Sequence, residues 1–196
     1  GNIDYETNST LNIYVQVSDG DNTYQKAMIV NVNNVKETPS IQVSNVLKTF
    51  DDENFDLTAT SSSTGVFTFN ILDTNIATVT GSTTTIVGVG STSITVIQAE
   101  DNNFTSATAT LTLTVNKADP TITFDDLTKN YGDANFNLVA TSSSTGAFTF
   151  NILDANVATV NVSNTTIVGA GTTTVTVTQA ADSNYNAATA TMTLTV

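Results

Sequence analysis

The sequence predicts an all-β protein built from tandem β-sandwiches. Residues 50–115 recur without a gap as residues 131–196, so that Thr60, for example, has its counterpart Thr141 81 positions later. Roughly two-thirds of the paired positions are identical, which indicates a duplicated domain. Thr, Val and Ile are abundant while only two prolines occur, and β-branched residues favour strands. Short runs of alternating apolar and polar residues, separated by turn residues, complete the pattern.

Residues 1–38 predict an incomplete domain. Apolar and polar residues alternate over residues 11–17, the turn Asp19-Gly20-Asp21-Asn22 follows, and a second apolar run occupies residues 27–32. This pattern is typical of a β-hairpin. Because two strands alone are marginal in water, we expect the hairpin to belong to a domain that begins upstream or to be completed by another chain.

The strand pattern over residues 39–118 predicts a first complete domain, and residues 119–196 are expected to form its copy. The strands expected in the first copy are residues 41–46, 55–60, 66–71, 77–79, 84–87, 91–99 and 108–115. Seven short strands at these spacings suit a seven-stranded, Greek-key sandwich of the immunoglobulin type. The linker at residues 116–120 is short and ends in proline, so we expect a semi-rigid connection between the copies.

Strand alternation also predicts the core of each copy. The expected core residues of the first copy are Leu57, Phe67, Phe69, Val79, Ile86, Ile94, Val96, Leu111 and Leu113. Their counterparts are Leu138, Phe148, Phe150, Val160, Ile167, Val175, Val177, Met192 and Leu194. Threonine is expected on the solvent face of the strands.

Composition excludes several classes of function. The chain has 18 acidic residues against five lysines, no arginine and a net charge of −13, which repels nucleic acids and anionic membranes. Histidine and cysteine are absent, which excludes disulfides, thiolate or imidazole metal sites and imidazole-based catalysis. No apolar run is long enough to span a bilayer, and the first residues are not a signal peptide, so we expect any export signal outside this fragment.

The N-terminal segment resembles the C-terminal half of a cadherin repeat. The resemblance rests on the tripeptide DYE at residues 4–6, on VSDG at residues 17–20 and on VNVNNVKETP at residues 30–39. It covers about a fifth of the chain and implies a sandwich related to the immunoglobulin fold.

Cadherin repeats bind calcium between successive repeats, so this resemblance implies ligand roles for Asp4, Glu6 and Glu37. The chain departs from the cadherin pattern at two positions of the linker. Asn34 stands in place of the first aspartate and Lys36 in place of the asparagine. These changes remove one anionic ligand and add a cation, which implies low affinity.

The two copies resemble the bacterial immunoglobulin-like repeats of large secreted adhesins. The second copy contains YGDANF at residues 131–136, ATSSSTG at 140–146, IVGAG at 167–171 and ADSNYN at 181–186. The first copy keeps ATSSSTG but is more acidic elsewhere. This resemblance covers about three-quarters of the chain and implies a spacer on the bacterial cell surface.

Acidic residues occur mainly in predicted turns, which suggests calcium at two places. We call the connection between residues 1–38 and the first copy the first joint, and the connection between the copies the second joint. The expected calcium ligands are Asp4, Glu6, Glu37, Glu100 and Asp101 at the first joint, and Asp51, Asp52, Glu53, Asp119 and Asp182 at the second. Clustered carboxylates suit calcium, which takes six to eight oxygen ligands. The alternative is that acidic turns only keep a threonine-rich surface soluble.

Other chemistry is weakly supported by the sequence. The threonine arrays of the strands follow from β-propensity without ice binding. The serine runs at residues 61–63 and 142–144 have no histidine to activate them, and the carboxylate pairs lack an aromatic cleft for a sugar. An isopeptide crosslink needs a buried lysine, whereas Lys48, Lys117 and Lys129 are expected in loops. We therefore expect no enzyme activity.

Three functions remain open. The first is a non-catalytic stalk segment of a large, secreted bacterial cell-surface adhesin or filament, stiffened by calcium at its joints. Its partners would be neighbouring repeats, with host or surface glycans bound by regions outside this fragment. The second is a self-assembling filament subunit, completed by strand donation between chains. The third is an accessory module of a secreted enzyme.

Overall fold

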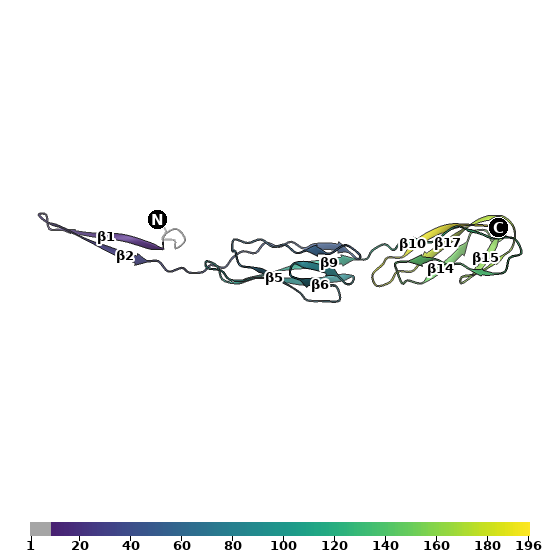
Figure 1. Ribbon diagram of the computed structural model, residues 1–196, viewed down its shortest axis with the longest axis horizontal. Coiled ribbons are helices and arrows are strands. Elements are labelled where there is room, and N and C mark those ends of the chain that lie inside the picture. The colour runs from purple at the N-terminus through teal and green to yellow at the C-terminus, as the bar shows by residue number, and fades with distance from the viewer. Residues whose placement is uncertain (1–8) are drawn as a thin grey trace. The chain divides into compact units, whose positions relative to one another are not determined.

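The computed structural model describes residues 9–196, and its regular elements there are all β-strands, from β1 (Thr10–Ser18) to β18 (Ala188–Thr195) (Figure 1). No helix long and apolar enough to cross a membrane occurs in this part of the chain. Contacts divide the chain into two compact units. One comprises Gly1–Val43, Ala59–Thr68 and Val96–Ala109, and the other comprises Ser44–Thr58, Phe69–Thr95 and Thr110–Val196.

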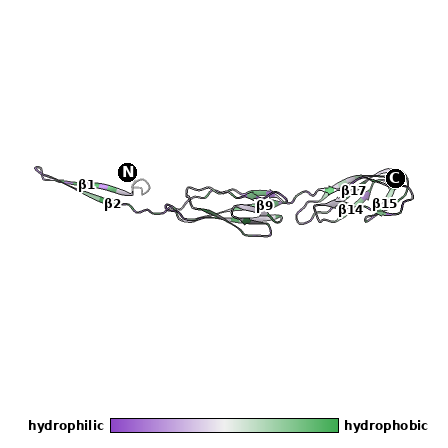
Figure 2. Cartoon of the chain, in the orientation of Figure 1, coloured by the Kyte–Doolittle hydropathy of each residue, from purple (hydrophilic) through white to green (hydrophobic). Residues whose placement is uncertain are grey.

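The N-terminal strands form the predicted β-hairpin. β1 pairs with β2 (Thr23–Asn31) in antiparallel register, and Asp19 Oδ1 accepts the backbone N–H of Asn22 at 2.8 Å in the turn. The sheet has two strands, and every residue in them except the half-buried Leu11 is exposed. Figure 2 shows hydrophobic residues in both strands. Among the described residues, the apolar face of this hairpin is thus left uncovered.

The second copy is a sandwich of two main sheets. Its strands are β10 (Ile122–Thr123), β11 (Leu127–Thr128), β12 (Phe136–Asn137), β13 (Thr141–Ser142), β14 (Phe148–Ile152), β15 (Ala158–Asn161), β16 (Asn164–Ile167), β17 (Thr172–Gln179) and β18. One sheet has the order β11-β18-β17-β14 and the other β12-β16-β15, while β10 pairs with β13. β11 runs parallel to β18, and the other paired strands are antiparallel.

The first copy repeats this strand order. Its strands are β3 (Val46–Thr49), β4 (Phe55–Asp56), β5 (Phe67–Ile71), β6 (Ala77–Thr80), β7 (Thr83–Ile86), β8 (Gly90–Gln98) and β9 (Ala107–Asn116). The sheets are β3-β9-β8-β5 and β4-β7-β6. The prediction of an all-β chain with tandem sandwiches is confirmed.

The first two strands of each sandwich differ from the prediction. The strand expected at residues 41–46 is instead β3, four residues long and parallel to β9, preceded by an isolated bridge between Gln42 and Thr60. The chain changes its pairing partner between Gln42 and β3. Within this stretch the side-chain oxygen of Asn45 accepts the backbone N–H of Thr112 at 2.9 Å. The strand expected at residues 55–60 is shortened to β4, which covers only Phe55–Asp56. The end of the expected strand pairs with a different segment, since Thr60 bridges Gln42.

The core prediction is confirmed for ten of the eighteen residues, five in each copy: Leu57, Ile94, Val96, Leu111, Leu113, Leu138, Val175, Val177, Met192 and Leu194. The other eight are half-buried. Four polar side chains are completely buried, namely Thr84, Thr165, Gln98 and Gln179. Placing all threonines on the solvent face was therefore wrong, because some strand positions that face the interior hold threonine.

Candidate functional site

An aspartate in each copy organises the loops at the start of the sandwich. In the first copy, Asp101 Oδ2 accepts the N–H and the hydroxyl of Thr64 at 2.7 and 2.9 Å and the hydroxyl of Ser63 at 2.9 Å. Its Oδ1 accepts the N–H groups of Asn103 and Phe104, both at 2.8 Å. The N–H of Thr64, followed by that of Asn103, lowers the pKa of this carboxyl, since hydrogen bonds to the charged form favour it.

Asp182 has the same role in the second copy. Its Oδ2 accepts the N–H and hydroxyl of Thr145, both at 2.8 Å, and its Oδ1 accepts the N–H groups of Asn184 and Tyr185. These bonds, led by that from the N–H of Thr145, lower the pKa of Asp182. The motifs ATSSSTG and ADSNYN of the second copy are thus joined by one carboxylate.

The linkers approach these loops with identical geometry. Glu37 forms a parallel bridge with Phe104, and Ala118, 81 positions later, forms the same bridge with Tyr185. The N–H of Glu37 donates to the carbonyl of Asn103 at 2.9 Å, and that of Ala118 donates to the equivalent carbonyl at 3.0 Å. The chain therefore enters both copies along the same path.

The first joint contains an ion pair. Lys36 Nζ lies 2.9 Å from Glu100 Oε2, and both side chains are more than one-third exposed. Asn34 Nδ2 donates to the carbonyl of Asn102 at 2.7 Å. The predicted ligands Asp4 and Glu6 lie outside the described residues. Of the predicted set, the structure therefore brings Glu37, Glu100 and Asp101 into one region, but pairs Glu100 with a lysine.

The second joint is built around Tyr185. Its hydroxyl donates to Asp51 Oδ2 at 2.5 Å, and its ring meets the ring of Phe50 edge-on, with centroids 5.5 Å apart and planes at 83°. The hydrogen bond to Asp51 raises the pKa of Tyr185. All three residues belong to the same compact unit, so a loop of the first copy contacts a loop of the second directly.

Further contacts surround this centre. Lys117 Nζ donates to the backbone carbonyl of Asp182 at 2.5 Å. The N–H of Val89 donates to Asn184 Oδ1 at 3.4 Å, and Asp119 Oδ1 accepts the side-chain amide of Asn186 at 2.7 Å. Both the linker and a second loop of the first copy therefore take part in the joint.

The remaining acidic residues predicted for the second joint serve the local turn or face solvent. Asp52 Oδ2 accepts the N–H of Thr49 at 2.9 Å, as Asp133 accepts that of Asn130 in the second copy. The side chain of Glu53 is exposed. Asp52 is thus a turn-closing residue at a position that both copies share.

In the second joint, three of the predicted calcium ligands already accept hydrogen bonds. Calcium needs several oxygens with free lone pairs directed at one point, whereas Asp51, Asp119 and Asp182 accept hydrogen bonds from Tyr185, Asn186 and Thr145. Across residues 9–196, no three acidic side chains are grouped so that they could hold a metal. Calcium binding by the predicted residues stays a prediction.

Sequence reasoning placed Asp51 at the second joint but missed Tyr185 and Lys117. Tyr185 looks like one of several scattered tyrosines, and Lys117 looks like a loop lysine. The signal lies in the differences between the copies: Tyr185 replaces Phe104, and Asp51 replaces the glycine found at position 132. The two substitutions together supply a donor and an acceptor for one contact.

Residues considered for catalysis have structural partners instead. Ser63 Oγ donates to Asp101 and accepts the N–H of Gly65 at 3.1 Å. Lys48 lies in β3, not in a loop as predicted, with its Nζ 4.7 Å from the centre of the Phe55 ring. Both side chains therefore have partners within the first copy.

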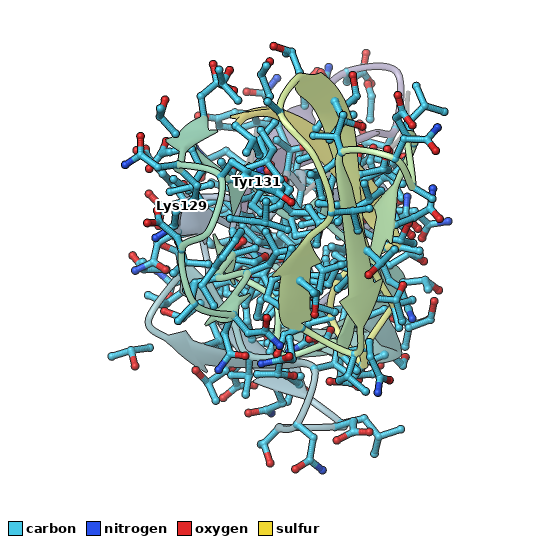
Figure 3. All side chains as sticks on the ribbon, turned by 90° about the vertical axis from the view of Figure 1, so that its right-hand side faces the viewer. Lys129 and Tyr131 are labelled. Atoms are coloured by element: carbon cyan, nitrogen blue, oxygen red, sulfur yellow. The ribbon has the colours of Figure 1, made fainter. Side chains whose placement is uncertain are left out.

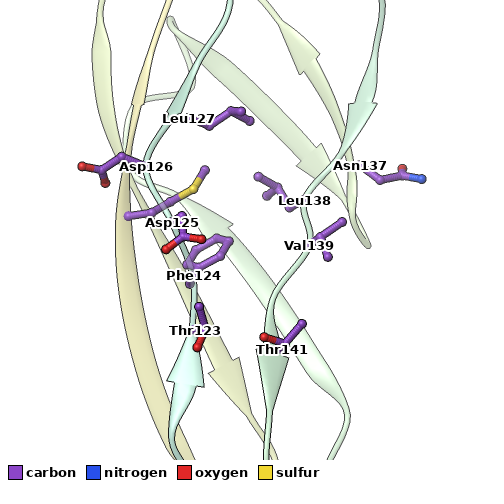
Figure 4. A pocket seen from close by; sticks show the side chains of 10 residues that line it. Thr123, Phe124, Asp125, Asp126, Leu127, Asn137, Leu138, Val139 and Thr141 are labelled. Carbon is purple, nitrogen blue, oxygen red and sulfur yellow. The ribbon is translucent and has the colours of Figure 1, made fainter.

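The second copy also contains an open cavity of about 390 Å³ where its first strand changes sheet (Figure 4). Phe124, Leu127 and Leu138 line it beside the carboxylates of Asp125 and Asp126. Asp126 Oδ1 accepts the N–H of Thr193 at 2.6 Å. This hydrogen bond ties the segment between β10 and β11 to β18. The cavity is consistent with an edge of the core that the short strands leave open.

No protein-family model and no curated protein sequence matches this chain. Solved structures to which it is similar include EC1-3 of mouse protocadherin-24, at 12% identity and a TM-score of 0.43, covering 100% of this chain and 82% of that one. A second is an endo-fucoidan hydrolase of glycoside hydrolase family 107, at 13% identity and a TM-score of 0.33, covering 96% of this chain and 34% of that one. A third is a SusE-like surface-located polysaccharide-binding protein of Bacteroides thetaiotaomicron, at 12% identity and a TM-score of 0.32, covering 96% of this chain and 55% of that one.

Proposed function

We propose that this chain is a non-catalytic spacer segment of a large bacterial cell-surface adhesin or filament. The observation that supports it most is the repeated linker geometry, in which Glu37 bridges Phe104 and Ala118 bridges Tyr185. Modules that receive their linkers in the same way extend a chain in equal steps, as tandem repeats do. The proposed boundaries are residues 1–38 for the partial N-terminal domain, 39–118 for the first copy and 119–196 for the second.

The chemistry of the chain is consistent with an extracellular spacer. The net charge of −13 with no histidine or cysteine favours a soluble, unreactive surface that repels nucleic acid and anionic membranes. Its partners are then the neighbouring repeats of the same long chain or filament. Binding to host or surface glycans is assigned to regions outside these residues.

Single-molecule extension of the full chain tests the spacer function. If the copies are independent folded modules, stretching releases them in two separate events, each lengthening the chain by about 80 residues at about 3.5 Å per residue, or roughly 280 Å before the folded length is subtracted. A single event that releases both copies together, or a smooth extension without events, would contradict the proposal.

A second candidate is a filament subunit completed by another chain. The observation in its favour is the two-stranded hairpin of β1 and β2, whose side chains Ile13, Val15 and Met28 are each more than 40% exposed. Strands added by another chain would satisfy the edges of this hairpin, and strands packed against its apolar face would cover these side chains. Sedimentation at rising protein concentration separates the candidates, because polymers support assembly and a monomer at all concentrations rejects it.

Calcium at the first joint remains part of the proposal, with Asp4, Glu6, Glu37, Glu100 and Asp101 as its ligands. A thermal melt of the full chain with calcium and with a chelator tests it. A ligand that binds only the folded state raises the unfolding midpoint. Equal midpoints under the two conditions would reject calcium binding.

A further inference from the structure

Equivalent aromatic rings in the two copies have different surroundings. Tyr131 occupies in the second copy the position of Phe50 in the first, and its side chain is 70% exposed (Figure 3). Phe50 is half-buried and packs edge-on against Tyr185, which is itself only 9% exposed. The ring at this loop position is therefore packed in the first copy and exposed in the second.

Asp51, the residue that contacts Tyr185, has its backbone in the left-handed conformation. Its φ is +70°, in the left-handed region that disfavours residues with a side chain. The second copy has Gly132 at the equivalent position, with a φ of +93°. Aspartate is one of the few residues other than glycine that adopt this conformation readily, and the Asp51 carboxylate is the acceptor for the Tyr185 hydroxyl.

We propose that the Asp51–Tyr185 contact, supported by the ring of Phe50, fixes the orientation of the two copies at the second joint without a metal ion. This inference deepens the proposed spacer function and rests on it, because a spacer transmits position only when its joints resist bending. It assigns to protein side chains the stiffening that bound calcium would otherwise supply. Lys117 holds the linker to the same loop through the carbonyl of Asp182.

The burial of Tyr185 explains why one hydrogen bond has a large effect here. A hydroxyl in contact with water loses little when its partner is removed, whereas a buried hydroxyl without a partner is left desolvated. Tyr185 is nearly buried whereas Asp51 is exposed, so breaking their bond favours separation of the loops, since separation restores water to the Tyr185 hydroxyl. The contact therefore favours one relative orientation.

Residual dipolar couplings of the full, ¹⁵N-labelled chain in excess EDTA test the proposal. Amides of residues 39–118 and of residues 119–196 are fitted separately for their alignment. We expect one common alignment tensor for the unmodified chain. Asp51→Gly and Tyr185→Phe introduce the residues that the chain itself has at the equivalent positions 132 and 104, so each copy should keep its fold, and we expect the common tensor to be lost.

Phe104→Tyr is the matched control, because it adds the same hydroxyl at the first joint and leaves the second joint intact. We expect this variant to keep the common tensor. Separate tensors in the unmodified chain would overturn the proposal, and so would a common tensor that survives both Asp51→Gly and Tyr185→Phe. Either result is compatible with two separate extension events, so the inference can fail while the spacer function stands.

Discussion

The carboxylate of Asp182 accepts hydrogen bonds from both the backbone N–H and the hydroxyl of Thr145, each at 2.8 Å. Asp101 and Thr64 form the same pair in the first copy, at 2.7 and 2.9 Å. The pair joins two loops that are distant in sequence and places the residues that receive the linker. The geometry of each joint therefore depends on an aspartate whose side chain does not itself cross the joint.

This arrangement predicts a specific loss of stability in acid. The bonds from Thr145 and its neighbours lower the pKa of Asp182 in the folded chain, while the unfolded value is about 3.9. The stabilisation is therefore complete above about pH 4 and declines as the pH falls toward the folded pKa. Asp182→Asn should lower the melting midpoint of the second copy at pH 7 and flatten its dependence between pH 5 and 2.

Asp125→Asn is the control for this measurement, because Asp125 is exposed. It should leave the pH dependence of the midpoint close to that of the unmodified chain. An Asp182→Asn variant that still loses stability as steeply in acid would show that other carboxylates cause the decline.

Replacement of Gln179 should destabilise the second copy strongly. Its side chain is completely buried, and its Nε2 donates to the carbonyls of Ser144 and Gly146, both at 3.0 Å. Gln179→Leu leaves two carbonyl oxygens without this donor, which should cost about 2–4 kcal/mol of unfolding free energy. Chemical denaturation measures it, with the exposed neighbour Thr178→Ala as control, and a loss below that of the control would contradict the assignment.

Replacement of Val162 should stabilise the second copy. Val162 has a φ of +60° in the turn between β15 and β16, where the first copy has Gly81 at +65°. A β-branched residue is strained there, so Val162→Gly should gain about 1 kcal/mol and raise the melting midpoint by roughly 4–8 °C. The reverse change, Gly81→Val, should lower the midpoint of the first copy, and opposite signs would refute the explanation by strain.

The ion pair at the first joint should contribute little. Lys36 and Glu100 are 37% and 67% exposed, and exposed pairs typically contribute under about 1 kcal/mol. Lys36→Met should therefore change the unfolding free energy of the first copy by less than this amount. The same small change at low and at high salt supports this view, whereas a large effect that disappears in salt would contradict it.

The fold was predictable because the repeat and the strand alternation are both written in the sequence. The 81-residue offset gives the two sandwiches, and the alternation gives core residues such as Val96 and Leu113, which are fully buried. The first strand of each sandwich was misplaced because it changes sheet within a few residues. Pairing with two different partners leaves no sustained alternation to detect.

The position of the candidate site at the joints was predictable from the sequence, but the hydrogen-bond partners of its carboxylates were not. The acidic turns correctly mark the ends of the sandwiches where Glu37 meets Phe104 and Asp51 meets Tyr185. Hydrogen bonding decides what a carboxylate does there, and the sequence does not reveal which donors will face it. Tyr185 was missed because its partner Asp51 is 134 positions away, and the motif that contains Tyr185 does not indicate a contact at that distance.

A calcium titration of the full chain, followed by the amide signals of Asp51, Asp119 and Tyr185, tests the central claim that protein side chains alone hold the second joint. The protein is first cleared of divalent ions with a chelator. We predict that these signals stay in place as calcium rises to millimolar concentration, because the carboxylates already have hydrogen-bond partners. Saturable shifts of the three signals would contradict the claim.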